Sequence, residues 1–168
     1  MGAIAMQLGA LMLDYMHPKL HLAIGGTVFV VSFMISRYME NFYMFLLFYS
    51  IIAGIGYGII YILPLKNAWL FFPDKKGMVG GIILSSHSFA AIGWSFFTVY
   101  LINPDNEIPN LYINVGNSLE VLYSADSQPP HNVPYCLEVV SYVLTGLLVM
   151  AIILMYKKQT VTFDLELA

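Results

Sequence analysis

Charged residues are scarce in this chain, and their scarcity excludes a water-soluble domain. Asp, Glu, Lys and Arg make up 10% of the 168 residues, whereas hydrophobic residues make up 59%. A soluble domain carries about 25% charged residues, so this chain cannot cover a surface that faces water. The net charge of −3 leaves no basic field suited to nucleic acid. The mean hydropathy of +0.74 indicates a membrane protein, with the lipid bilayer as its first partner.

Cysteine pairs and catalytic motifs are also missing. Cys136 is the only cysteine, which excludes an intrachain disulfide. The sequence has no nucleophile elbow, no paired His and Cys spacing for a metal, and no phosphate-binding loop. The glycines of GIGYG lie inside an apolar run instead of after a strand, which argues against a dinucleotide site. We therefore expect no enzyme activity, no catalytic residues, no metal and no cofactor.

Apolar runs divide the chain into five helical segments. About 20 apolar residues span a bilayer as a helix, and the first run falls short of that length by about one or two turns. The predicted spans are 2–16, 20–36, 42–63, 77–102 and 135–156, followed by a polar tail over 159–168. The sequence therefore predicts an all-α membrane protein with four full transmembrane helices and one truncated N-terminal helix.

Prolines and polar residues mark the expected helix ends. Pro64 is predicted to stop the third helix, because proline does not continue a helix. Asp74 is placed to cap the fourth as an N-cap carboxylate. The stretch 103–134 is rich in Pro, Asn and acidic residues and has no Lys or Arg. It is predicted to be a long exposed loop with a short helix around 118–123.

Basic residues gather on one side of this predicted topology. Of the 7 basic residues, only Arg37 falls on the side of the acidic 103–134 loop. Loops rich in Lys and Arg face the cytoplasm. We therefore expect the 64–76 turn and the C-terminus to be cytoplasmic and the 103–134 loop to lie outside. Tyr and Trp near the predicted boundaries agree with an interfacial aromatic belt.

The stretch 53–93, two apolar runs joined by a polar turn, organises the chain. Small residues four apart let helix backbones approach closely in lipid. We predict helix packing at four glycines with this spacing: Gly54, Gly58, Gly77 and Gly81. The alternative is that these glycines line a path by keeping side chains out of it.

Polar and aromatic side chains inside the spans are candidates for a substrate path. Tyr57 and Tyr61 share a helix face, and their hydroxyls need partners, from a neighbouring helix or from a substrate carboxylate. His87 lies roughly 15 Å past Lys76 at helical rise, and intramembrane ionisable groups are functional candidates. It either bonds serines of a neighbouring helix or faces a cavity, taking up a proton or bonding an organic anion. Trp94 is the fourth candidate.

Three stretches resemble the major facilitator superfamily. GIGYGIIYILP over 54–64 and WLFFPDKKG over 69–77 are similar to the fourth-to-fifth-helix region of its oxalate/formate antiporter and monocarboxylate transporter branch. The turn LDYMHPK over 13–19 is similar to that group's signature between helices two and three. The resemblance implies that the five runs match helices two to six, as a partial N-terminal transporter half over 1–158. It also implies alternating-access transport of small organic anions.

The resemblance has departures and gaps. His17 replaces a glycine and Tyr15 an arginine of the turn that carries Asp14, and Ser50 stands where other branches carry an arginine. In the family Asp14 would make a gating contact that anchors the turn to a neighbouring helix; the alternative is a solvated acid.

Family members have twelve helices, and the antiporter branch binds the substrate carboxylate with the half that these residues do not match. We therefore expect that the C-terminal half or a second copy is needed for a complete site, and that this chain alone takes up no substrate. A non-transporting structural or accessory membrane protein, or a truncated gene product, is the alternative.

Overall fold

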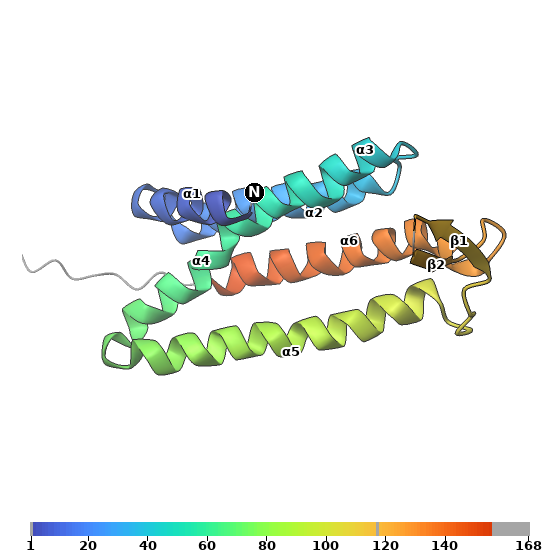
Figure 1. The fold of residues 1–168 in the computed structure, drawn as a ribbon. Helices are drawn as coiled ribbons and strands as arrows, with labels where there is room; N and C mark the ends of the chain where they lie inside the picture. Colours follow the sequence, from blue (N-terminus) through green and yellow to red (C-terminus); the bar gives the residue numbers. More distant parts are fainter. Residues whose placement is uncertain (1, 117, 156–168) are drawn as a thin grey trace, which may run out of the picture.

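A computed structural model describes residues 2–116 and 118–155 of the chain (Figure 1). The elements are α1 (Gly2–Tyr15), α2 (Pro18–Ser36), α3 (Phe42–Leu46), the π-helical turn η1 (Leu47–Ile52), α4 (Ala53–Phe71), the 3-10 turn η2 (Pro73–Lys75), α5 (Lys76–Ile102), β1 (Leu111–Val115), β2 (Ser118–Leu122) and α6 (Gln128–Leu154). The predicted tail over 159–168 lies outside the described residues, and the division into a transporter half and a tail stays a prediction.

The predicted all-α membrane class is confirmed. Four segments of the described chain are long and apolar enough to cross a membrane: Pro18–Ser36, Phe42–Phe71, Pro73–Ile102 and Gln128–Leu154. The first apolar helix, over Ile4–Tyr15, is shorter, as expected. The third span is continuous because η1 joins α3 to α4 without a break.

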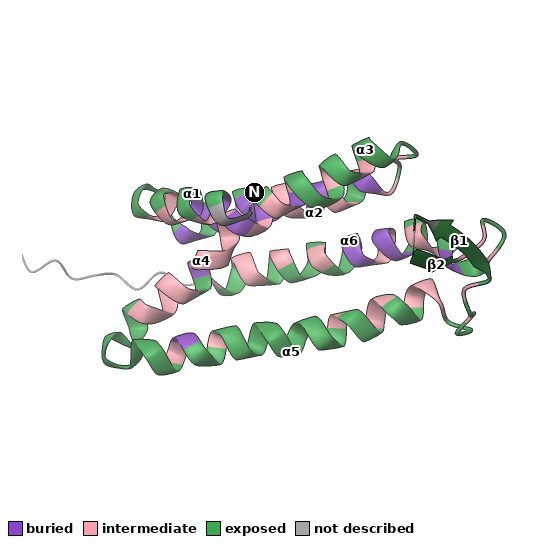
Figure 2. Cartoon of the chain, viewed as in Figure 1, coloured by how far each residue is buried: buried purple, intermediate pink, exposed green. Residues whose placement is uncertain are grey.

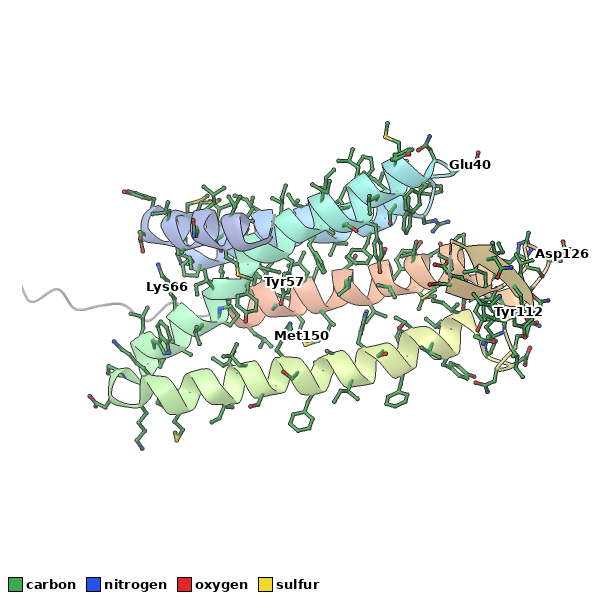
Figure 3. The ribbon with its side chains drawn as sticks, in the orientation of Figure 1. Glu40, Tyr57, Lys66, Tyr112, Asp126 and Met150 are labelled. Atoms are coloured by element: carbon green, nitrogen blue, oxygen red, sulfur yellow. The ribbon has the colours of Figure 1, made fainter. Side chains whose placement is uncertain are left out.

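The helices run side by side, and α4 connects the two parts of the bundle (Figure 1). α1 and α2 pack against α4, α2 also contacts α6, and α5 contacts both α4 and α6. The turn between α4 and α5, near Lys66, lies at one end, which we call the basic end. The β1–β2 hairpin and the labelled residues Glu40 and Asp126 lie at the opposite end, which we call the hairpin end (Figure 3).

Close helix contacts form at glycines, although mostly not at the predicted ones. A side chain at Gly9 would overlap the backbone of Ile59, so α1 lies directly on α4. Of the four predicted packing glycines, Gly58 is buried in α4. The other three, Gly54, Gly77 and Gly81, have no other atom within 4 Å of an added Cβ in the described structure. Their packing against a further segment stays a prediction.

Two predicted helix boundaries are wrong. Pro64 lies inside α4, which continues to Phe71, because neighbouring groups can re-satisfy the carbonyl that a proline frees in a membrane helix. Asp74 is not an N-cap residue: it lies in the 3-10 turn, and Lys75 occupies the N-cap of α5 without a side-chain cap bond. Chain direction changes at Phe72, whose backbone is non-helical at φ −127° and ψ 66°.

The predicted 103–134 loop is shorter than expected and contains a hairpin. α6 begins at Gln128, so its first prolines fall in the opening turn, where a missing N–H breaks no helical bond. The predicted short helix around 118–123 is wrong, since β2 pairs there with β1 in the register Leu111↔Leu122. The turn between the strands contains Gly116, whose φ of 62° favours glycine.

Burial is uneven across the helices (Figure 2). Leu63 of α4 and Cys136, Leu137 and Val140 of α6 belong to the core. In α5 only Gly80 is buried among the described residues. Most of the length of α5 is therefore exposed or half-buried in the described structure.

Candidate functional site

Three of the four predicted path residues come together where α4 faces α5. The Tyr57 hydroxyl lies 2.8 Å from Nε2 of His87. The Tyr57 and Tyr61 rings are 5.5 Å apart, and the His87 ring is 6.1 Å from each of them. We call these residues the Tyr–Tyr–His cluster. They border a cavity of about 200 Å³, whose other walls are apolar side chains of α2, α4 and α5.

The hydrogen-bonding capacity of the cluster is only partly used. When Nε2 of His87 is unprotonated, the Tyr57 hydroxyl donates to it and Nδ1 carries the remaining imidazole proton. The Tyr61 hydroxyl has no hydrogen-bond partner among the described residues. The cluster can therefore still offer an O–H group to an acceptor such as a carboxylate oxygen.

His87 bonds a tyrosine and not the serines that sequence reasoning suggested. Ser86 and Ser88 flank His87 on α5 itself, so they are not the neighbouring-helix serines of that alternative, and they donate to carbonyls of α5 at Ile82 and Leu84. Such bonds satisfy a serine in a membrane helix without reaching another helix. The neighbouring helix does supply the partner expected for Tyr57, through His87.

Trp94 lies away from the cluster, in a second cavity. This cavity has a volume of about 410 Å³ and lies between α2, the α3–η1 segment, α5 and α6. Trp94 shares its wall with Tyr49, which belongs to the π-helical turn, and with Cys136. Tyr49 stacks on Phe45 at 5.0 Å. The structure therefore does not join Trp94 to Tyr57, Tyr61 and His87.

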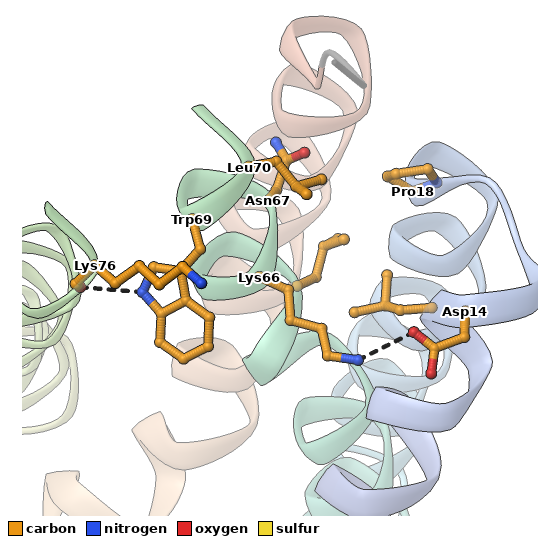
Figure 4. A pocket seen from close by; sticks show the side chains of 9 residues that line it. Asp14, Pro18, Lys66, Asn67, Trp69, Leu70 and Lys76 are labelled. Carbon is orange, nitrogen blue, oxygen red and sulfur yellow. Dashed lines mark hydrogen bonds and ion pairs between the residues drawn. The ribbon is translucent and has the colours of Figure 1, made fainter. Parts of the chain in front are cut away.

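Asp14 meets a lysine at the basic end. Nζ of Lys66 lies 3.2 Å from Oδ1 of Asp14 (Figure 4). The same Nζ lies 2.9 Å from the Ala10 carbonyl oxygen. The pair links the end of α1 to α4, so Asp14 contacts a neighbouring helix, while 63% of its side chain stays exposed to solvent. Its role in gating stays a prediction.

Sequence reasoning missed an ion pair at the hairpin end. Nη1 of Arg37 lies 2.7 Å from Oε1 of Glu138, which joins α2 to α6. The hydrogen bond to Glu138 raises the pKa of Arg37, so the guanidinium stays charged. The sequence signal was the opposite charge of Arg37 and Glu138 near the same predicted membrane boundary.

Sequence reasoning also missed a buried histidine near the start of α2. His21 is fully buried, and its Nε2 lies 3.0 Å from the carbonyl oxygen of Gly9. Nδ1 of His21 has no partner among the described residues. His21 lies at the edge of a predicted span, and sequence spacing alone gives it no contact partner. In the structure its contact with the Gly9 carbonyl links α2 to α1.

Comparisons with known proteins find distant transporters. Over 121 residues, the chain is 25% identical to Apicoplast pyruvate carrier 1 of Toxoplasma gondii, covering 71% of this chain and 22% of the carrier. It is 25% identical over 77 residues to the uncharacterized MFS-type transporter YhjX of Escherichia coli, covering 46% of this chain and 19% of that protein. It is also 25% identical over 89 residues to the MFS-type transporter opdF of Penicillium oxalicum, covering 53% and 21%.

These similarities support a relationship to membrane transporters as a class, but they do not support membership of the oxalate/formate branch. No family model matches the chain, and no solved structure matches it. The chain spans about a fifth of the length of these relatives. It is thus an integral, multi-pass membrane chain whose distant relatives are membrane transporters.

Proposed function

We propose that this chain forms part of a membrane transporter that moves small organic anions by alternating access. Monocarboxylates such as pyruvate, and oxalate or formate, are the candidate substrates. The distant pyruvate carrier supports the monocarboxylate class, and the sequence motifs support the wider branch. The major facilitator bundle, in which helices four and five border the central cavity, is the fold that this proposal assumes for α4 and α5.

The observation that carries the proposal is the contact between Tyr57 and His87. It places a phenol and an imidazole 2.8 Å apart between two helices that cross the membrane. Polar groups are costly inside a membrane, so they mark substrate or proton paths there. His87 would take up a proton or bond the anion, and Tyr61 would donate its hydroxyl to the carboxylate.

The proposed orientation puts the basic end in the cytoplasm. Lys66, Lys75 and Lys76 lie near that end, whereas the acidic residues of the hairpin end lie opposite. Positive residues favour the cytoplasmic side. A substrate would therefore reach the Tyr–Tyr–His cluster from the cytoplasm by passing the α4–α5 turn.

Uptake of labelled pyruvate, lactate, formate and oxalate tests the proposal. The complete product of the gene that encodes this chain is expressed in vesicles beside the His87→Leu variant. His131→Leu is the matched control, since it makes the same chemical change at an exposed histidine of the first turn of α6. We expect uptake in the wild type and in His131→Leu, and loss of uptake at equal expression in His87→Leu.

Normal uptake in His87→Leu would remove His87 from the mechanism. Absence of uptake of all four anions by the complete product would favour a structural or accessory membrane protein. The 168-residue chain alone is expected to give no uptake.

A further inference from the structure

We propose that the basic end of the chain holds a second anion site, which binds the carboxylate of a small organic acid between Lys66 and Lys76. The choice of ligand rests on the proposed transport function. The site itself is separate from the Tyr–Tyr–His cluster and lies nearer the end of α4. It would receive the anion before or after the cluster does.

The site is a cavity of about 320 Å³ between α1, the start of α2, α4 and the start of α5 (Figure 4). This volume is within the usual range for small-molecule sites, roughly 300–1,000 Å³. Leucine and proline side chains form much of its wall, and the Trp69 indole forms one side. Such a wall suits the carbon chain of an organic acid, whereas the lysines suit its carboxylate.

The charged side chains that line the cavity have a net charge of one positive unit. Lys66 and Lys76 contribute two ammonium groups, and Asp14 contributes one carboxylate. A bound monocarboxylate would therefore balance the charge of the cavity. The side chain of Lys76 makes no hydrogen bond or ion pair with the described residues, so it is available to a ligand.

Lys66 already pairs with one carboxylate in this cavity. Its Nζ lies 3.2 Å from Oδ1 of Asp14, and the exposed fractions of the Lys66 and Asp14 side chains are 37% and 63%. An ion pair this open to solvent is weak. The Ala10 carbonyl also holds the Lys66 ammonium, at 2.9 Å. A ligand carboxylate can therefore replace or join Asp14 while Lys66 stays in position.

The second site lies on the same helix as the cluster. Tyr61 and Lys66 are five positions apart on α4, which corresponds to about 7.5 Å of helix axis. Trp69 fixes the outer border, because its Nε1 donates to the Lys76 carbonyl at 3.1 Å. An anion held by the lysines would thus lie about 7.5 Å along the helix axis from the level of Tyr61, on a different face of α4.

Fluorescence of Trp69 can report binding directly, without any transport. The chain has 2 tryptophans, and Trp94 lies in the other cavity. The purified full chain with Trp94→Phe, in nanodiscs of zwitterionic lipid, therefore reports on Trp69 alone. Pyruvate is the probe, and methyl pyruvate and sodium chloride at equal ionic strength are the ligand controls. We expect a saturable change with pyruvate alone.

Variants in this background separate a real site from a general charge effect. Lys76→Gln should weaken pyruvate binding at least tenfold. Lys75→Gln, the matched control, removes the same charge from the adjacent residue, which does not line the cavity, and should change binding less than twofold. Asp14→Asn should tighten binding severalfold, because it removes the competing carboxylate. This opposite sign cannot come from unfolding.

The outcomes distinguish this inference from the proposed function. Equal effects of Lys76→Gln and Lys75→Gln, or an unchanged affinity in both, would overturn the second site even if uptake is found. Binding that is lost in Lys76→Gln but kept in His87→Leu would support it even if uptake is absent. Loss of the pyruvate response in nanodiscs of anionic phospholipid would assign the cavity to a lipid phosphate and overturn the small-anion assignment.

Discussion

Gly56 of α4 lies against the backbone of Phe29 in α2, with no room between them for a side chain. An added Cβ would be 2.6 Å from the Phe29 nitrogen and 2.9 Å from the Gly25 carbonyl oxygen. In lipid, apolar burial gives helices little preference for one another, so close packing must hold them together. The crossing of α2 and α4 therefore depends on Gly56 having no side chain.

Replacing Gly56 with alanine should destabilise the bundle. Overpacking of a tight contact costs about 1–3 kcal/mol, and the neighbour here is rigid backbone. Gly54→Ala is the matched control, because an added Cβ at Gly54 meets no atom within 4 Å. Thermal unfolding in detergent, followed by circular dichroism, should show a lower Tm for Gly56→Ala only. Equal Tm values for the two variants would contradict this packing.

Exchanging the charges of Arg37 and Glu138 should restore what either single change removes. Arg37→Glu and Glu138→Arg each place like charges at a contact of 2.7 Å, so each should lower the Tm and separate α2 from α6. The double variant recreates an opposite pair in the same place. A double variant as unstable as the worse single variant would show that the pair does not hold these helices.

The two tyrosines of the cluster should respond differently to loss of their hydroxyls. Tyr61→Phe removes a donor that no described residue uses, so it should raise the KM for the transported anion about tenfold, the cost of one hydrogen bond to a charged group. Tyr57→Phe removes the partner of His87 and should lower uptake at unchanged expression, because the imidazole loses the contact that positions it. Uptake by the complete gene product measures both. Unchanged kinetics in Tyr61→Phe would exclude its hydroxyl from the substrate contact.

Cysteine labelling should place the two ends of the bundle in different compartments. Cys136 is buried with 4% of its surface exposed, so the native chain should react slowly with a membrane-impermeant maleimide. In intact cells Asp126→Cys should be labelled from outside, whereas Lys75→Cys should be labelled only after the membrane is permeabilised. Labelling of both residues from the same side would contradict the proposed topology.

The sequence predicts the number and class of the helices well, because the length of an apolar run is a direct consequence of bilayer thickness. It also places Tyr57 and Tyr61 on one face, since a helical turn fixes that relation. Helix ends are harder to predict. Pro64 looks like a stop, yet the membrane helix continues through it to Phe71.

Contacts between helices were the part that sequence reasoning could not supply. The pairings of Arg37 with Glu138 and of His21 with Gly9 join residues far apart in the chain. Nothing in local spacing selects those partners. The spacing of Gly77 and Gly81 suggested close packing, but the tight contacts in the described structure form at Gly9, Gly25, Gly26 and Gly56, since helix orientation decides which glycine meets a neighbour.

The uncovered length of α5 has a practical consequence for work on this chain. No residue in the most apolar window of that helix is buried in the described structure, so either lipid tails or a further helical segment can cover its surface. Replacing lipid tails by an apolar helix surface changes the free energy of association little. Shape and a few hydroxyl or imidazole contacts will therefore select what rests on α5, and detergent tails of different length will compete there unequally.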